Sequence, residues 1–321
     1  MASEPNNILV LGGTGFVGSV LCEKLVRRGG GSGRIAVPSR RVACAKHLQL
    51  LPTVELIDAD VHDDAELARL VAGCDAVVNL VAILHGSEAD FRRVHVDLPR
   101  RLAQACVAAK VRRVVHVSAL GADAAAPSKY LRSKAAGEAA LKLPGLALTV
   151  LRPCVIFGAN DKFLNLFARL QTLFPVMPLV GARARFQPVW VDDVAEAIVR
   201  SLGSPATIGQ TIECAGPQTY TLAELVRLAG RWSGHERPVL PLPAALGRLQ
   251  ALVMEWLPGE PLMSRDNIDS MKVDNVASGR LPGLESLGIA AAALESTAPA
   301  WLGKQGELAR LDRWRAGAHR G

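Results

Sequence analysis

The stretch "NILVLGGTGFVGSVLCEKLVRRGG" (residues 7–30) decides the fold of this chain. Its β-rich start predicts a strand buried on both faces, and apolar residues at three- and four-residue steps then predict an amphipathic helix. Between the two, Gly12 permits a sharp turn, Gly15 lets the backbone approach a pyrophosphate, and Gly18 lets the helix pack tightly on the strand. The helix N-terminus offers N–H groups and a positive dipole end to phosphates. This pattern predicts a dinucleotide site.

Length and charge narrow the class of protein. A chain of 321 residues exceeds the usual single-domain size, so we expect a main domain with a smaller lobe. The formal charge of +7 comes mainly from scattered arginines, without a basic block or interleaved aromatic residues, so no nucleic-acid partner is predicted. An anionic cofactor or an acidic membrane surface suits this charge.

The cysteines and the N-terminal residues indicate the cellular compartment of the protein. Six cysteines lie far apart, with no CxxC pair and no histidine at ligand spacing, which is typical of reduced thiols and predicts no metal site. The polar start is not a secretory signal, and the longest apolar run, 76–84, is too short to cross a bilayer. The expected location is cytoplasmic, with peripheral attachment to the inner membrane left open.

The segment after the next predicted strand, 34–39, indicates which dinucleotide is bound. An NAD site places an acidic residue about 20 positions after the glycines, where it holds the ribose 2′-hydroxyl. No acid occurs from 34 to 47, and Ser39 is followed by Arg40 and Arg41. Guanidinium groups attract a 2′-phosphate, so we favour NADP(H), with NAD(H) as the alternative. The competing interpretation is that both arginines simply face water.

Strands and helices continue to alternate along the chain. Further strands are predicted at 54–61, 75–84, 111–120 and 146–151, with helices at 63–74 and around 89–109, where Pro99 should start or kink a helix. This alternation predicts an α/β protein with a doubly wound parallel sheet, the Rossmann fold, and a smaller C-terminal substrate lobe.

The predicted domain boundary follows from the same alternation. Residues 1–158 are expected to form the dinucleotide-binding domain, to which strands near 189–191 and 211–214 return. Residues 159–321 are expected to form mostly the small substrate or partner lobe. The apolar stretch 242–257 is interpreted as a packing helix, with a quinone or membrane contact as the alternative.

A candidate proton-transfer group follows the 111–120 strand. Tyr130 and Lys134 are four residues apart, one helical turn from each other. A phenol titrates near pH ~10, and a neighbouring ammonium group favours its anion. Ser118, at the end of the preceding strand, is placed to orient a substrate carbonyl. The three residues predict the proton-transfer half of a carbonyl reduction whose hydride comes from a nicotinamide.

These motifs together resemble the short-chain dehydrogenase/reductase superfamily, in its extended and atypical branches. The resemblance rests on "GGTGFVG" (12–18), Asp60-Val61, the Tyr130/Lys134 spacing, "LRPCVIFG" (151–158) and "VWVDDVAEAI" (189–198). The segments "ECAGPQTYTLAELV" (213–226) and "SRDNIDSMKVDNV" (264–276) resemble the branch of the nucleotide-binding accessory subunit of respiratory complex I, alpha-subcomplex subunit 9, and its bacterial relatives.

The resemblance implies a role for each matching residue. In addition to the glycines and arginines, it implies cofactor contacts along the pyrophosphate, at the adenine, at the ribose and over the nicotinamide. The pyrophosphate contacts are Thr14, Phe16 and Val17, and the adenine contacts are Asp60 and Val61. The ribose contacts are Val81, Ala82, Tyr130 and Lys134, and the residues over the nicotinamide are Pro153 and Val155. Ala119, Leu120 and Gly121 replace the serine-rich turn of the extended enzymes, so the role of Ser118 is open.

Three functions remain after this comparison. The first is an NADP(H)-dependent, epimerase-like oxidoreductase that acts on a carbonyl or quinone (ubiquinone-type) substrate, linked to the respiratory chain, electron transport or quinone metabolism. The second is a non-catalytic accessory or assembly factor of complex I type, in which Tyr130 and Lys134 only grip ribose. The third is an NADPH redox sensor. A respiratory-chain protein is the expected partner, or the membrane surface through the basic tail 307–321.

Overall fold

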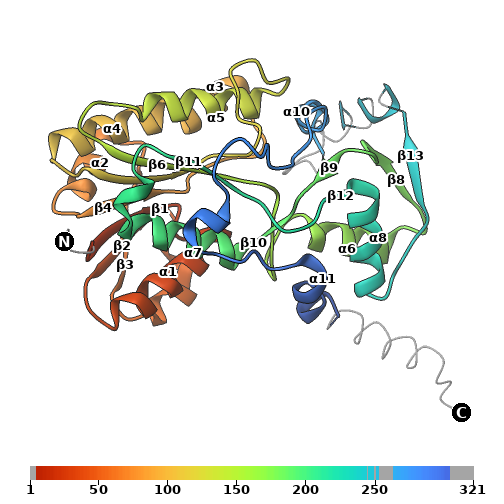
Figure 1. Cartoon of the computed structure of the whole chain (residues 1–321), viewed down its shortest axis with the longest axis horizontal. Helices are drawn as coiled ribbons and strands as arrows, with labels where there is room; N and C mark the ends of the chain where they lie inside the picture. The colour runs from red at the N-terminus through yellow and green to blue at the C-terminus, as the bar shows by residue number, and fades with distance from the viewer. Residues whose placement is uncertain (1–4, 244, 249–250, 253–262, 304–321) are drawn as a thin grey trace, which may run out of the picture. The chain divides into compact units, whose positions relative to one another are not determined.

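The computed structural model describes residues 5–243, 245–248, 251–252 and 263–303. Its centre is a parallel sheet of seven strands in the order β11-β6-β5-β4-β1-β2-β3 (Figure 1). The strands are β1 (Asn7–Leu11), β2 (Arg34–Ser39), β3 (Val54–Asp58), β4 (Ala76–Asn79), β5 (Arg113–Val117), β6 (Ala147–Pro153) and β11 (Thr211–Cys214). The predicted doubly wound parallel sheet is therefore confirmed.

Helices cover both faces of this sheet, as its apolar strands require. Figure 1 shows α1 (Phe16–Gly29) and α7 (Val191–Gly203) on one face, and α2 (Asp64–Val71), α4 (Leu98–Ala108) and α5 (Lys129–Ala140) on the other. Lys24 ties α1 to α7 through an ion pair of 2.7 Å between its Nζ and Asp192 Oδ2. The second face buries a core that includes Leu9, Val77, Leu102 and Val114.

The helix between β4 and β5 is interrupted by a π-helical turn, and Pro99 is the one sequence signal for this interruption. The chain forms α3 (Glu88–Arg92), one π-helical turn, η2 (Arg93–Asp97), and then α4, with Pro99 in its first turn. A proline ring clashes with the carbonyl four residues earlier, here that of His95, and the wider turn relieves this clash. A Cβ on Gly137 of α5 would overlap that carbonyl oxygen, so only glycine fits there. The expected helix start at Pro99 is confirmed.

The chain divides into two compact units. The first consists of Met1–Pro153, Val191–Cys214 and Ala277–Ala290, and the second of Cys154–Trp190, Ala215–Val276 and Ala291–Gly321. The sequence also predicts a strand of the central sheet near 189–191, but β10 (Val189–Trp190) pairs with β7 (Ile156–Phe157) in the second unit. With only two residues, β10 has no length to join the seven-stranded ladder, and the chain enters α7 directly after it.

The second unit has its own apolar core between two helices. Helices α6 (Leu164–Leu173) and α8 (Leu222–Trp232) pack together around Phe167, Leu225 and Val226. A capping box between Thr221 and Glu224 starts α8. The remaining described elements of the first unit are η1 (Val42–Leu50), η3 (Pro205–Thr207) and η4 (Leu284–Leu287). Those of the second unit are β8 (Met177–Val180), β9 (Arg185–Phe186), β12 (Tyr220–Thr221), β13 (Val239–Leu242), α10 (Arg265–Ser270) and α11 (Leu294–Thr297).

Two stretches singled out in the sequence lie partly or wholly outside the described residues. They are the basic segment 307–321 and much of the apolar stretch 242–257. Within the described ranges, the longest apolar helices are too short or too polar to cross a bilayer.

The turn between β1 and α1 brings backbone against backbone. Gly12 has a φ of 80°, in the left-handed region that favours glycine, and its carbonyl accepts a hydrogen bond of 3.0 Å from the Gly15 N–H. A Cβ on Gly18 would overlap the Gly12 carbonyl oxygen and lie 2.5 Å from Gly13 Cα. The first turn of α1 therefore has room for no side chain at this position.

Replacing Gly18 by alanine should destabilise the first unit, because either α1 or the glycine turn has to move. We expect Gly18→Ala to lower the free energy of unfolding by about 2–4 kcal/mol, measured by urea unfolding followed by circular dichroism. Gly29 lies in the same helix, and a Cβ there would meet nothing within 4 Å. Gly29→Ala is therefore the matched control and should stabilise by about 0.4–1 kcal/mol. Equal effects of the two substitutions would contradict the close packing.

Candidate functional site

The glycine turn and the start of α1 form the first part of the candidate site. Gly15 is the N-terminal cap of α1 and carries no side chain that could bond the first N–H groups. Phe16 and Val17 open the helix, and Thr14 stands in the turn just before it. Uncapped N–H groups at a helix start bind anionic oxygens, so these residues fit the pyrophosphate of a dinucleotide.

The end of β2 provides the second part. Ser39 ends the strand, and its hydroxyl accepts a hydrogen bond of 3.2 Å from the Arg41 N–H. The side chains of Arg40 and Arg41 are exposed, and neither forms an ion pair with any carboxylate in the described ranges. By contrast, Arg34 at the other end of the strand pairs with Glu55. Two exposed and unpaired guanidinium groups fit an additional phosphate.

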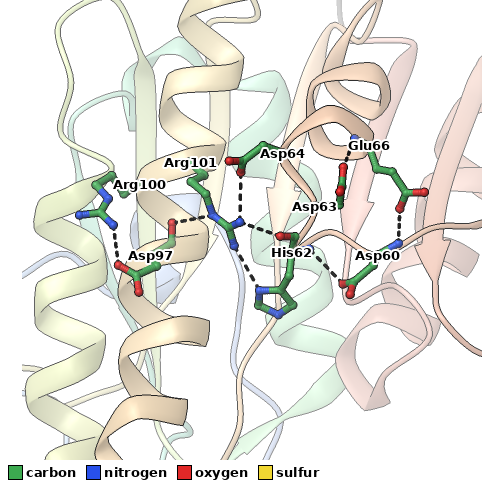
Figure 2. Close-up of polar contacts among 8 residues, drawn as sticks. All are labelled: Asp60, His62, Asp63, Asp64, Glu66, Asp97, Arg100 and Arg101. Atoms are coloured by element: carbon green, nitrogen blue, oxygen red, sulfur yellow. Dashed lines mark hydrogen bonds and ion pairs between the residues drawn. The ribbon is translucent and has the colours of Figure 1, made fainter.

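The loop after β3 is held rigidly by its neighbours (Figure 2). The Asp60 N–H donates to Glu66, and the Asp60 carboxylate accepts from the His62 N–H at 3.0 Å. Arg101 of α4 donates to the His62 carbonyl at 2.7 Å and to Asp64 at 3.0 Å. The loop that contains Asp60 and Val61 is therefore fixed from both sides before any ligand binds.

Cations gather around His62 in this loop. Burial lowers the pKa of His62; the charge of Asp60 opposes that shift, and the charges of Arg93, Arg101 and Arg40 add to it. His62 is consequently neutral at pH 7, and its Nδ1 accepts from Arg101 at 3.3 Å. The positive charge near the loop after β3 therefore comes from the three arginines and not from His62.

A buried polar chain fixes the loop after β4. The amide of Asn79 is fully buried; its oxygen accepts from the Val81 N–H at 3.2 Å, and its nitrogen donates to His116 Nδ1 at 3.2 Å. Two residues further along, the Ile83 N–H donates to His95 Nε2 at 3.0 Å. Val81 and Ala82, the expected ribose neighbours, lie between these two anchors.

His95 also holds the helix of Tyr130 and Lys134. Because its Nε2 accepts from Ile83, the hydrogen-bond network assigns the proton to Nδ1, which donates to the Ser133 hydroxyl at 2.8 Å. Ser133 in turn donates to the Tyr130 carbonyl at 2.7 Å. The His95 and Tyr130 rings meet edge to face, with 5.6 Å between their centroids. Burial lowers the pKa of His95 to about 3, so this link is neutral at physiological pH.

The protonation of Tyr130 and Lys134 differs from the sequence-based expectation. Burial raises the pKa of Tyr130 to about 12, and the ammonium group does not offset this shift. Burial also lowers the pKa of Lys134 to about 8, against an opposing effect of Glu138. The Lys134 ammonium donates to the Val117 carbonyl at 2.8 Å. At neutral pH the pair is therefore a neutral phenol and an ammonium cation.

Ser118 is not connected to this pair by a hydrogen bond. Its side chain is buried, and its hydroxyl has no hydrogen-bond partner in the described ranges; the same is true of His116 Nε2. The Ser118 N–H donates to the Leu151 carbonyl at 2.7 Å, which fixes the backbone at the end of β5. An unsatisfied buried hydroxyl is available to a ligand, but no described contact joins it to Tyr130 or Lys134.

Pro153 and Val155 belong to different units. Pro153 ends β6 in the first unit, and its carbonyl accepts from the Leu120 N–H at 2.9 Å. Val155 belongs to the second unit, where its N–H donates to the Asn275 side chain at 2.8 Å. Asn275 also accepts from the Cys154 thiol, which anchors the segment around 275. Among the described residues, no cluster of three or more His, Cys, Asp or Glu could hold a metal ion.

Sequence reasoning missed four residues that fix the site: Asn79, His95, Ser133 and Glu138. The Asn79–His116 and His95–Ser133 hydrogen bonds join residues 37 and 38 positions apart, so no local sequence pattern predicts them. Glu138 did carry a signal, because it follows Lys134 at the four-residue spacing of neighbours on one helix face.

Comparison with known proteins identifies the family and the fold. The family model "NAD dependent epimerase/dehydratase family" matches residues 8–215. NADH dehydrogenase [ubiquinone] 1 alpha subcomplex subunit 9, mitochondrial, of Mus musculus is 34% identical over 300 residues, which cover 89% of this chain and 77% of that protein. A ceramide reductase of Caulobacter vibrioides is 28% identical over 260 residues, 80% of each chain.

A solved structure has the same fold. The dTDP-glucose 4,6-dehydratase DesIV of Streptomyces venezuelae, with NAD and TYD bound, has a TM-score of 0.65 and 24% identity. The match covers 74% of this chain and 85% of that one. At this identity the similarity shows the fold alone.

Removing the buried charge of Lys134 should stabilise the protein in a pH-dependent way. The folded pKa, about 8, lies below the unfolded value of 10.5, so the fold carries the full cost of the buried ammonium below pH 8. That cost disappears as the pH rises from about 8 to 10.5. We expect Lys134→Met to raise the free energy of unfolding by about 1–3 kcal/mol at pH 7, and less at pH 10. An equal increase in the free energy of unfolding at both pH values, measured by urea unfolding, would show that burial of the ammonium does not destabilise the fold.

Proposed function

This chain belongs to the NAD dependent epimerase/dehydratase family, and on that premise we propose that it binds NADP(H) and acts as an oxidoreductase on a carbonyl or quinone substrate. The observation that carries the choice of cofactor is the pair of exposed, unpaired guanidinium groups of Arg40 and Arg41, in a unit whose first helix has an uncapped start. Ser39 and the rigid loop of Asp60 and Val61 complete the adenosine end of the proposed site.

The charge of the site supports NADP(H) over NAD(H). A 2′-phosphate adds a doubly negative group that two arginines can bind through charge-assisted hydrogen bonds. A free 2′-hydroxyl requires an acidic acceptor, and residues 34–47 contain none. The arginines around His62 strengthen the positive potential near the same loop.

The proposed chemistry is proton donation by Tyr130. When bound, the nicotinamide supplies the hydride of a carbonyl or quinone reduction. Tyr130 retains its proton at neutral pH, which is the state needed to protonate the substrate oxygen that becomes negative. The ammonium of Lys134, which donates to the Val117 carbonyl, adds a positive charge one helical turn from Tyr130. His95 and Ser133 hold the backbone of Tyr130 in place during this transfer.

An accessory role is the second candidate, and one observation favours it. The Ser118 hydroxyl is not connected to Tyr130 or Lys134 in the described structure, and Ala119 and Leu120 follow it where a catalytic hydroxyl would be expected. In this role the same residues grip NADP(H) as a structural ligand. Relatives that are named as subunits of mitochondrial NADH dehydrogenase support a respiratory-chain protein as partner. A peripheral position at the inner membrane belongs to the same proposal.

Removing the two arginines tests the choice of cofactor. We expect Arg40→Ala/Arg41→Ala to weaken NADPH binding about 10–100-fold in isothermal titration calorimetry and to leave NADH binding within about twofold, because the lost contacts are charge-assisted. Arg69→Ala/Arg112→Ala removes two exposed arginines without ion pairs elsewhere in the first unit and controls for net charge. If both double variants weaken NADPH equally, Arg40 and Arg41 hold no 2′-phosphate.

Replacing Tyr130 separates the two candidate functions. Tyr130→Phe should keep NADPH binding within about tenfold, because it loses at most one hydroxyl contact to the ribose. It should lose about 10²–10⁴-fold in turnover, because it lacks the donated proton. The assay is NADPH consumption, followed by absorbance, with a panel of aldehydes, ketones and short-chain quinones. A wild-type chain that binds NADPH but consumes none across the panel supports the accessory role; full turnover by the variant rejects Tyr130 as the acid.

A further inference from the structure

The buried ammonium of Lys134 has little to balance its charge. Its side chain is 2% exposed, and in the described ranges its only hydrogen-bond acceptor is the Val117 carbonyl, at 2.8 Å. An ammonium group has three donors and is costly to bury unless an opposite charge is nearby. A nearby anionic group would reduce the cost of burying Lys134.

The titratable groups around Lys134 leave one candidate. His95 on η2 and His116 on β5 are close enough to feel its charge, but burial keeps both neutral. Tyr130, on the same helix, keeps its proton. Glu138, one turn further along α5, is the described group whose negative charge raises the pKa of Lys134.

Glu138 is itself fixed by a two-pronged contact with β6. Arg152 donates from Nε to one carboxylate oxygen at 2.9 Å and from Nη2 to the other at 2.7 Å. The side chains of Glu138 and Arg152 are 5% and 22% exposed. Both oxygens of the buried Glu138 carboxylate therefore accept charge-assisted hydrogen bonds from the same guanidinium group.

A row of alternating charges continues from the Glu138–Arg152 pair to β11, the edge strand of the sheet. Arg152 on β6 lies directly opposite Glu213 on β11 in the parallel register. Glu213 accepts from the N–H and the hydroxyl of Ser278, at 2.7 and 3.1 Å. Lys134, Glu138, Arg152 and Glu213 therefore alternate in charge from α5 to the last strand, and Ser278 anchors the outer end.

We propose that Glu138, clamped by Arg152 one helical turn from Lys134, is a positioning residue for the Lys134 ammonium. The functional meaning of this charge rests on the proposed cofactor role of Lys134. A purely structural role for the Glu138–Arg152 pair would stabilise the fold equally with or without the ammonium. The two roles therefore differ in whether Glu138 and Lys134 are energetically coupled, and in whether that coupling depends on pH.

A double-mutant cycle measures this coupling without any cofactor. Wild type, Lys134→Met, Glu138→Gln and the double variant are unfolded in urea at pH 7 and at pH 9.5. We expect the two residues to be coupled about tenfold in the unfolding equilibrium at pH 7, and less than about twofold at pH 9.5, where Lys134 is neutral. Glu88→Gln is the matched control, because Glu88 is exposed and pairs with Lys129 instead. It should show no coupling to Lys134.

Equal coupling at both pH values, or none at pH 7, would overturn the proposal. A second measurement extends it to the cofactor: the affinity for NADPH should fall above pH 8 in the wild type, and about one pH unit lower in Glu138→Gln, with Glu88→Gln unchanged. An unshifted profile in Glu138→Gln rejects the positioning role. A wild type that binds no NADPH at any pH rejects the proposed function, while the cycle still decides the role of Glu138.

Discussion

The close packing of α1 against its own glycine turn is the constraint on which the nucleotide end of the site depends. A Cβ on Gly18 would overlap the backbone of Gly12 and Gly13, so the first turn of α1 packs directly on the glycine turn that follows β1. Any side chain there would push the helix away and separate the proposed phosphate-binding groups from the ends of β2 and β4. The position of the helix start, rather than any single polar side chain, defines the site.

The sequence predicted those parts of the molecule that follow from local periodicity. The seven parallel strands follow from short β-rich runs, the start of α1 from three glycines, and the start of α4 from Pro99. The two-residue pairing of β10 with β7 could not be predicted, because so short a strand has no periodicity. Pro99 signals an interruption near residue 95, but the π-helical form of the turn at 93–97 has no signal in the sequence.

The polar contacts of the site were even less predictable from local sequence patterns. Tyr130 and Lys134 could be identified from their spacing, but their protonation could not, because it depends on burial. The His95–Ser133 and Glu138–Arg152 contacts join elements through the register of the sheet and the width of one helical turn. Together they hold one helix at three points: at Ile83 through His95, at β5 through Lys134, and at β6 through Glu138. Such bracing suits a catalytic pair and a permanently bound nucleotide alike.

The central claim is that this member of the family selects NADP(H) through the cations at the end of β2. The most direct test is equilibrium dialysis of the wild-type chain against equimolar NADPH, NADH, NADP⁺ and NAD⁺, with mass spectrometry of the nucleotide retained. The account predicts that the 2′-phosphorylated forms dominate the bound fraction. Retention of NADH or NAD⁺ in equal or larger amount, or of no nucleotide at all, would contradict it.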